Sequence, residues 1–324
     1  MVPLSVLDLS PITQGGDAAQ SFRNTLDLAR HCESWGYRRF WLAEHHGMPG
    51  IASAATSVVI GHVAGGTSTI RVGAGGIMLP NHSPLVIAEQ FGTLESLYPG
   101  RIDLGLGRAP GSDQLTARAL RRNLASDADE FPLDVQELAD YLSDTPRQAV
   151  RAVPGIGTKV PLWILGSSLY GAQVAAALGL PYAFASHFAP AQLMSAIEVY
   201  RTRFQPSAQL AKPYLMLGFN VFAADTLGEA RFLATSMQQA FVNLRSGRPS
   251  ALPPPMEGYL ERLEPQERAL LDQVLSCSAV GTGETVQSAM KDFVAGTGAD
   301  ELIISGAMFN HAARLRSYQL AIGA

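Results

Sequence analysis

The segment TIRVGAGGIMLPNHSPLVIAEQFGTLESLYPGRIDLGLG, residues 69–107, decides the fold. It contains two short apolar runs, 70–79 and 102–106, which are separated by a helical pattern. A Ser-Pro pair at 83–84 is typical of a helix start, and the later Pro-Gly pair ends the same helix. A strand, a helix and a second strand in this order predict two parallel strands joined by a crossover helix.

The same alternation continues toward both ends of the chain. The apolar runs that we expect to form strands are residues 4–9, 39–43, 70–79, 102–106, 161–165, 181–185, 214–223 and 301–305. Eight such units in 324 residues fit a closed α/β barrel, the (β/α)8 TIM barrel with eight parallel strands, as a single domain over 1–324. An open doubly wound sheet is the alternative, but its GxGxxG fingerprint after the first strand is missing.

Composition excludes several classes of protein. Charged residues make up 16%, hydrophobic residues 47%, and the net charge is −4, which argues against disorder and against nucleic-acid binding. The two cysteines, Cys32 and Cys277, are too few for a disulfide framework or a multi-cysteine metal site. The start of the chain lacks the pattern of a signal peptide, and no stretch predicts a membrane span. We therefore expect a cytoplasmic protein without membrane partners.

One stretch, residues 245–265, has the composition of a long loop and contains three consecutive prolines. Long loops in compact domains are often functional lids. If this loop follows the seventh strand, it lies near the catalytic rim, either as a lid or as an inert insertion.

Candidate catalytic residues stand at the end of the second strand, because a barrel of this kind carries its site at the carboxyl ends of its strands. They are Glu44, His45 and His46. A histidine beside a carboxylate can take or give protons near neutral pH. Side chains alternate along a strand, so Glu44 and His45 cannot both point inward unless the strand has already turned. A metal site and a structural hydrogen-bonded cluster are the alternatives.

The third strand is rich in glycine and is followed by two polar residues at the rim. Gly73, Gly75 and Gly76 indicate either the close approach of a backbone or flat ligand, or tight barrel packing. Asn81 and His82 follow, where they could reach a ligand.

A cation and a pair of hydroxyl groups follow the next two strands. Arg108 can bind a phosphate through paired hydrogen bonds, or serve as a structural ion-pair partner. Gly166, Ser167 and Ser168 open a helix, where backbone N–H groups favour an anion, although an ordinary serine cap is the alternative. His187 follows the sixth strand and is open to either a functional or a structural role.

Taken together and in order, these segments resemble the luciferase-like flavin-dependent monooxygenases, relatives of the bacterial luciferase α subunit, and within them the single-chain luciferase family oxidoreductases. The resembling segments span nearly the whole chain: LSVLDLSPI, GYRRFWLAEHH, the 69–107 segment with the RAPG after it, WILGSS and GADELIISGAMFNHAARLRSY. The resemblance implies an oxidoreductase that uses FMN, usually reduced FMN from a separate NAD(P)H:flavin reductase. It implies that one oxygen atom of O2 is inserted into a small organic substrate by way of a peroxyflavin.

The resemblance also implies roles for individual residues. His45 matches the catalytic histidine of the family, with Glu44 and His46 as its neighbours. Gly75-Gly76 matches a small-residue pair joined by a cis peptide under the flavin ring. The residues that would bind FMN are Gly75, Gly76, Asn81, Arg108, Gly166, Ser167 and Ser168, of which Arg108 and the two serines would contact its phosphate. The family's reactive cysteine is replaced here by Gly107, so no thiol chemistry is carried over.

Other functions remain open from the sequence. They are an F420-dependent enzyme that transfers hydride on the same barrel, a non-catalytic flavin-binding protein, and a metal-dependent hydrolase that uses Glu44, His45 and His46. A homodimer is expected, with the Ala/Gly-rich segment 51–66 as its contact. No motif identifies the substrate.

Overall fold

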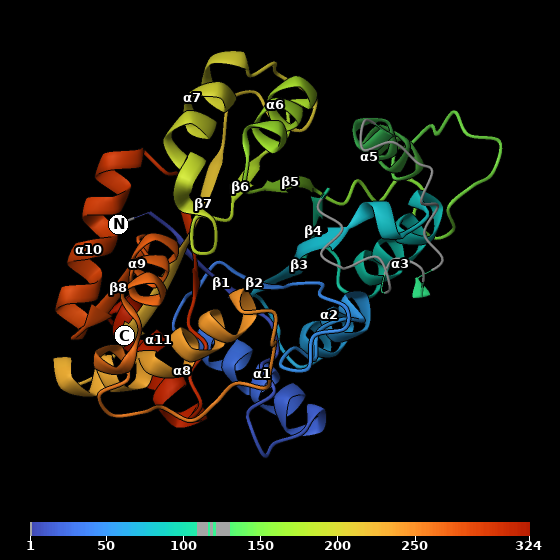
Figure 1. Ribbon diagram of the computed structural model, residues 1–324. Coiled ribbons are helices and arrows are strands. Elements are labelled where there is room, and N and C mark those ends of the chain that lie inside the picture. Colours follow the sequence, from blue (N-terminus) through green and yellow to red (C-terminus); the bar gives the residue numbers. More distant parts are fainter. Residues whose placement is uncertain (1, 109–115, 117–118, 121–129) are drawn as a thin grey trace.

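The structure, a computed structural model, describes residues 2–108, 116, 119–120 and 130–324. Eight parallel strands form a closed ring, and helices surround it (Figure 1). In ring order the strands are β1 (Leu4–Asp8), β2 (Arg39–Leu42), β3 (Arg71–Met78), β4 (Ile102–Gly107), β5 (Leu162–Gly166), β6 (Tyr182–Phe184), β7 (Leu215–Ala223) and β9 (Glu301–Ser305). The predicted TIM barrel is confirmed, and each of the eight predicted strands forms.

A further strand, β8 (Ser278–Gly281), was not predicted. It pairs in parallel with the outer part of β7, Asn220–Ala223, whereas β6 pairs with the start of β7 at Leu215–Leu217. Because β7 is nine residues long, its far end extends beyond β6 and offers an edge to a second partner. The short and partly polar SAVG run gives too weak a pattern to predict a strand.

Helices follow the strands and cover the outside of the barrel. They are α1 (Ala18–Ser34), α2 (Thr56–Gly65), α3 (Pro84–Leu97), α5 (Phe131–Tyr141), α6 (Leu169–Leu178), α7 (Leu193–Arg203), α8 (Leu227–Arg245), α9 (Pro265–Val274), α10 (Gly283–Thr297) and α11 (His311–Ile322). Sequence reasoning did not predict α9, although a proline in its first turn and a capping box between Glu264 and Glu267 mark its start. In the described part of the chain, no helix is long and apolar enough to cross a membrane.

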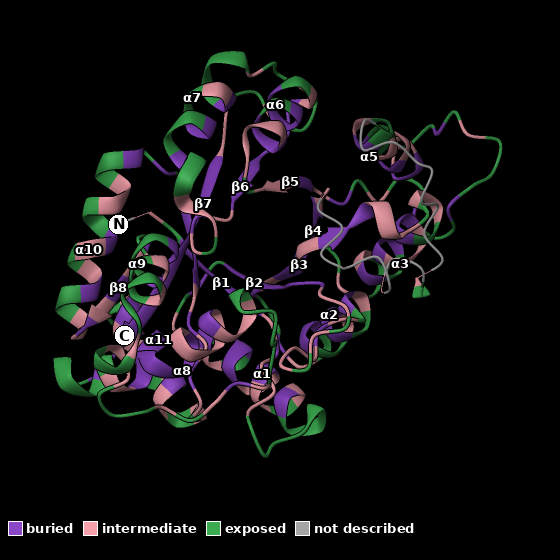
Figure 2. Cartoon of the chain, in the orientation of Figure 1, coloured by how far each residue is buried: buried purple, intermediate pink, exposed green. Residues whose placement is uncertain are grey.

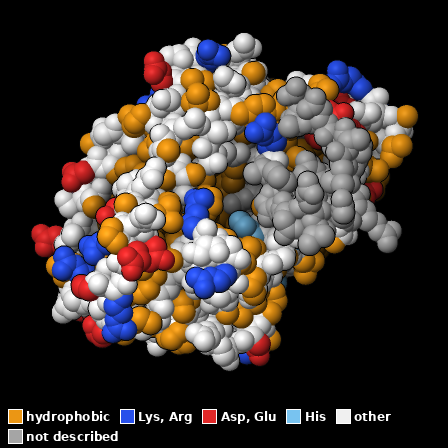
Figure 3. Space-filling view, viewed as in Figure 1, with side chains coloured by type: hydrophobic (Ala, Val, Ile, Leu, Met, Phe, Trp, Pro, Cys, Tyr) orange, Lys and Arg blue, Asp and Glu red, His pale blue; other side chains and the backbone are white. Residues whose placement is uncertain are grey.

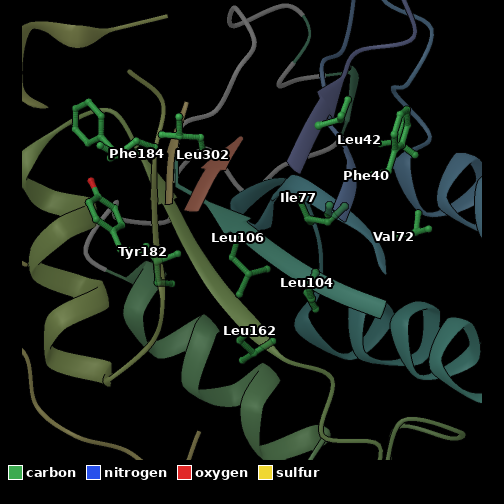
Figure 4. Packing of buried hydrophobic residues seen from close by; sticks show 14 of the residues in the cluster. Phe40, Leu42, Val72, Ile77, Leu104, Leu106, Leu162, Tyr182, Phe184 and Leu302 are labelled. Carbon is green, nitrogen blue, oxygen red and sulfur yellow. The ribbon is translucent and has the colours of Figure 1, made fainter. Parts of the chain in front are cut away.

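Alternation along the strands divides the apolar side chains into two cores. Even-numbered residues of β2, β3 and β4, such as Phe40, Val72 and Leu104, belong to the large cluster that the strands share with the helices. Figure 4 shows this packing, and Figure 2 shows that the strands are buried while the outer helix faces are exposed. The odd-numbered Trp41 and Trp163 belong to a smaller cluster inside the barrel, where their rings meet edge to face at 5.1 Å.

Charged side chains close the amino end of the barrel, below the interior cluster. The guanidinium of Arg39 lies between two carboxylates, 2.7 Å from Asp103 and 3.0 Å from Glu301. Arg71 also binds Asp103, and Tyr214 donates a hydrogen bond to Glu301. Asp103 and Glu301 are fully buried, so the ion pairs at this end of the barrel have buried carboxylates.

Candidate functional site

His45 continues the inward-facing row of β2. Arg39, Trp41 and Ala43 all face the barrel interior, and His45 is the next residue in that alternation. Its Nδ1 is buried and has no hydrogen-bond partner in the described structure. Burial lowers the pKa of His45, although the negative charge of Glu44 opposes the shift. The imidazole is therefore uncharged at neutral pH, in the form that accepts a proton.

Glu44 points the other way, toward β3, as the alternation requires. Its Oε1 accepts hydrogen bonds from His46 Nε2 at 2.7 Å and from His82 Nε2 at 2.8 Å. Its Oε2 accepts the backbone N–H of Met78 at 3.1 Å. Burial alone would raise the pKa of Glu44, but the hydrogen bonds from the two histidines and Met78 outweigh burial and hold it below its ordinary value. The carboxylate thus fastens the end of β2 to the end of β3.

This cluster corrects the membership of the metal site that the sequence left open. His82, and not His45, joins Glu44 and His46, and one ligand atom from each lies within 4.8 Å of the others. The three could hold a metal ion, but an ion would have to replace both hydrogen bonds to Oε1.

The glycines of β3 are explained by contacts within the barrel. The Gly75–Gly76 peptide bond is cis, as the resemblance implied. A Cβ atom at Gly76 would lie 2.6 Å from the carbonyl oxygen of Gly105, and one at Gly75 would lie 2.7 Å from Leu7. The backbone contact requires glycine at 76, whereas a methyl group at 75 would displace the end of the Leu7 side chain and crowd Trp41. At Gly107, by contrast, a Cβ would come no closer than 3.9 Å to any described residue, so the missing side chain leaves free space among the described residues of the rim.

The guanidinium of Arg108 lies over the ring of Tyr170 with a separation of 3.9 Å. Tyr170 is in the first turn of α6, and this helix begins directly after Ser167 and Ser168. Ser168 caps this helix without using its side chain for the capping hydrogen bond. A cation and the positive end of a helix therefore meet here. The arrangement favours an anion between them.

Strand register places these features along one continuous arc of the rim. Met78 at the end of β3 pairs with Gly107 of β4, which in turn pairs with Leu165 of β5. The arc thus runs from His45 past the Gly75–Gly76 bond to Arg108 and the serine turn. Asn81 lies beside it on the short 3-10 helix Leu79–Asn81. Every predicted site residue is in the described structure, on β2 to β5 or on the segments that directly follow these strands.

Two further polar residues lie at the carboxyl end of the barrel. They are His187, which follows β6, and Asn220 of β7. The amide of Asn220 is fully buried and donates to the carbonyl of His187 at 2.7 Å. The sequence leaves the role of His187 open between function and structure. It does not predict a role for Asn220, although an asparagine inside the apolar run LMLGFNVFA is a recognisable signal. Figure 3 shows a hollow near the middle of one face of the molecule, with histidine atoms visible at its edge.

The loop between α8 and α9, residues 246–264, contacts the segment that follows β1. Leu252 is buried and forms a bridge with Thr13, which follows β1. Its N–H and carbonyl bind the backbones of Ile12 and Gln14 at 2.8 Å each. Leu252 thus ties the loop to the chain after β1, and the loop includes one 3-10 turn, Leu260–Arg262.

Comparison with known proteins identifies the class that this barrel and rim define. The family model of the luciferase-like monooxygenases matches residues 2–301. A luciferase-like monooxygenase of Escherichia coli is 56% identical over 322 residues, which cover 99% of this chain and 96% of that protein. The chain therefore belongs to the luciferase-like monooxygenase family.

Other relatives have more specific names. The N-acetyl-S-alkylcysteine monooxygenase of Bacillus subtilis is 37% identical over 255 residues, covering 76% of this chain and 75% of that protein. The crystal structure of apo-MsnO8 has a TM-score of 0.89 at 32% identity and covers 100% of this chain and 98% of the other.

Two more distant structures share the fold alone. The oxygenating constituent of 3,6-diketocamphane monooxygenase from Pseudomonas putida, in complex with FMN, has a TM-score of 0.71 at 18% identity, with 98% of this chain and 96% of that chain covered. An F420-dependent secondary alcohol dehydrogenase has a TM-score of 0.67 at 13% identity, with coverages of 98% and 97%.

Proposed function

We propose that this protein is an FMN-dependent monooxygenase of the two-component type, which transfers one oxygen atom of O2 to a small organic substrate. A separate NAD(P)H:flavin reductase would supply the reduced FMN. The observation that carries the proposal is the position of Arg108 over Tyr170, at the positive end of α6. A cation at the positive end of a helix suits the terminal phosphate of FMN.

The residues at the rim fit a planar ring with a phosphate tail. Arg108, Ser167 and Ser168 would hold the phosphate, with Gly166 allowing the close turn. The Gly75–Gly76 stretch would lie beneath the ring, and the free space at Gly107 leaves room beside it. Asn81 would contact the ring from the neighbouring 3-10 turn. When bound, reduced FMN supplies the electrons that activate O2.

The protein's own residues would control the proton and the water in this reaction. His45 is uncharged and faces the interior, so its unpartnered Nδ1 can accept and return one proton near the reacting atoms. Glu44, through His46 and His82, fixes the backbone on both sides of the site. Residues 246–264 would cover the mouth as a lid on a single barrel domain and exclude water from the bound substrate.

The subunits would pair through α2 and α3, the region where the sequence predicts a contact. These helices lie side by side, because Tyr98 at the end of α3 donates a hydrogen bond to the carbonyl of Gly61 on α2 at 3.2 Å. Val58 on α2 is 71% exposed and Leu97 on α3 is 63% exposed. Large apolar side chains that remain exposed on adjacent helices suit a homodimer interface. Sedimentation that shows only monomer would contradict this arrangement.

The function is tested by supplying reduced FMN and ¹⁸O2 to the protein with a panel of thioethers, ketones, alkenes and phenols. N-acetyl-S-methylcysteine is the first member, because of the relative that acts on N-acetyl-S-alkylcysteines. Mass spectrometry should find a product that carries one ¹⁸O atom, and mixtures without protein should not form it. Turnover with reduced F420 in the absence of oxygen, and none with FMN and oxygen, would assign the protein to hydride transfer instead.

A further inference from the structure

The stretch after β6 is fastened to β7 by side chains. The backbone ladder between these strands ends at the pair Phe184–Leu217. Beyond it, Ser186 Oγ donates a hydrogen bond to the carbonyl of Gly218 at 2.6 Å. Asn220 Nδ2 then donates to the carbonyl of His187 at 2.7 Å. His187 is therefore held at a defined place beside β7, although it lies outside regular secondary structure.

Gly218 makes room for the His187 ring. Gly218 is two residues beyond Met216, which belongs to the interior cluster, so it also faces the inside of the barrel. A Cβ atom at Gly218 would lie 2.0 Å from His187 Nδ1. The imidazole therefore occupies the space over the inner face of β7. It is also close enough to His45 for the two rings to interact electrostatically.

Three polar atoms from these residues have no hydrogen-bond partner in the described structure. They are His45 Nδ1, His187 Nδ1 and Asn220 Oδ1, and each is buried. The orientation of the Asn220 amide is fixed, because only its nitrogen can donate to the carbonyl of His187. Its oxygen is therefore a buried acceptor without a donor. Buried polar atoms without partners are rare in native proteins, and several in one place indicate a ligand.

The groups that this site offers carry no charge. Burial lowers the pKa of His187 to about 4, and the neighbouring His45 adds to the shift. The surrounding wall is apolar and includes Ala43, Ala183 and Ile303. A charged group placed here would lose its hydration without gaining an opposite charge, which is strongly unfavourable.

We propose that His187 and Asn220 form the substrate-recognition site of this enzyme, for a substrate whose end near His45 is uncharged and carries a hydrogen-bond donor. Amide N–H and hydroxyl groups are the donors that suit Asn220 Oδ1. The proposal rests on the proposed function and deepens it, because it names the residues that select the substrate and the chemical class that they accept.

The test uses three small probes and the ¹⁵N-histidine-labelled protein. N-methylacetamide has one N–H donor, N,N-dimethylacetamide has none, and acetate is charged. The imidazole signals of His187, assigned with a His187→Phe variant, should shift on titration with N-methylacetamide. The other two probes should bind about tenfold more weakly or less, because each lacks the donor or carries a charge. Equal responses to all three probes, or no response to any, would overturn the proposal.

Two variants test whether the preference for N-methylacetamide arises from these residues. Asn220→Leu removes the acceptor and should abolish the preference for N-methylacetamide. Gly218→Ala keeps both recognition residues in the sequence, but its methyl group would displace the imidazole of His187, so it should also abolish the preference. Circular dichroism on both variants shows whether they are folded, and retention of the preference in both folded variants would contradict the proposal.

A flavin titration separates this proposal from the function on which it rests. In His187→Phe and Asn220→Leu, the affinity for reduced FMN should stay within about twofold of that of the wild type. A loss of about tenfold or more would assign the two residues to flavin binding and overturn their role in substrate selection. If the wild type bound no FMN while the probe preference persisted, the proposed function would fail and the recognition site would stand.

Discussion

The two ends of the barrel contain polar side chains in opposite states. At the amino end, Arg39 lies between Asp103 and Glu301, and the acidic oxygens are bound by arginine, tyrosine, serine or tryptophan. At the carboxyl end, His45, His187 and Asn220 leave three buried atoms without partners. The same alternation of side chains builds both layers. The polar groups of the amino end bind one another, whereas the three buried atoms at the carboxyl end have no partner among the described residues.

Glu44 lies between these two extremes. Its carboxylate is satisfied by His46, His82 and the N–H of Met78, yet it stands next to the unpartnered His45. A satisfied cluster beside an unsatisfied group is the arrangement expected where one set of residues fixes the position of another. This difference supports the proposed division of roles, in which Glu44 positions its neighbours and His45 handles the proton.

Of the variants that test this difference between the two ends, His45→Gln at the carboxyl end should have the largest effect, which is on the rate of product formation. Loss of a proton-transferring group should lower the rate of oxygenated product formation by about 10²–10⁴-fold. The affinity for reduced FMN should change little, because the phosphate would be held elsewhere. The rate is measured with the substrate found in the ¹⁸O2 panel. His62→Gln, an exposed histidine on α2, is the control, and an unchanged rate in His45→Gln would remove His45 from the mechanism.

At the amino end, Asp103→Ala should reduce the free energy of unfolding by about 3–5 kcal/mol, because it leaves Arg39 buried beside one carboxylate and Arg71 without its carboxylate partner. Chemical denaturation measures the change. The matched control is Asp225→Ala, which breaks the exposed pair with Arg316 at 2.7 Å and should cost less than about 1 kcal/mol. Similar losses in the two variants would show that the amino end is not a specially stabilised layer.

The next effect concerns the anion site at the carboxyl end. Arg108→Ala should weaken the binding of reduced FMN by about 1.5–3 kcal/mol, because a charge-assisted contact is lost. Anaerobic fluorescence titration measures the affinity. Arg245→Ala is a close control, since Arg245 also lies over an aromatic ring, that of Phe188 at 5.3 Å. Equal affinities for the wild type and Arg108→Ala would exclude Arg108 from phosphate binding.

The smallest effect is a difference in the pH dependence of stability. In the folded protein, burial lowers the pKa of His187 from 6.5 to about 4, so the unfolded chain binds a proton that the folded chain does not within this range. Stability should therefore be unaffected by this group above pH about 6.5 and fall as the pH drops toward about 4.

The variant His187→Phe isolates this contribution, because the pKa values of His45 and His311, also lowered by burial, remain in the background. The wild type should lose about 1–3 kcal/mol more than the variant over this range, allowing for the partial exposure of the ring. Denaturation at a series of pH values measures the difference. Parallel curves for the two proteins would mean that His187 titrates normally and is not buried as described.

Much of the fold could be predicted from the sequence, because each strand and helix carries its own local pattern. The alternation of residues also predicts that Glu44 and His45 do not both point inward unless the strand has already turned, and in the structure Glu44 binds the N–H of Met78 on β3. The strand β8 and the helix α9 were missed, since one is short and partly polar and the other lies in a stretch that reads as loop.

The parts of the site that sequence reasoning missed depend on contacts through space. His82 binds Glu44 although the two are 38 residues apart in the sequence, and no spacing rule relates them. Arg108 meets Tyr170 only because β4 and β5 are neighbours in the barrel. The role of Gly218 in making room for His187 requires the positions of both backbones.

The central claim is that the carboxyl end of the barrel, where Arg108 meets the start of α6, binds a phosphorylated flavin. The most direct measurement is an anaerobic calorimetric titration of the wild-type protein with reduced FMN and, separately, with reduced riboflavin, which lacks the phosphate. We predict saturable binding of one FMN per chain and an affinity for riboflavin that is lower by about tenfold or more. No heat of binding with FMN, or equal affinities for the two flavins, would contradict the claim.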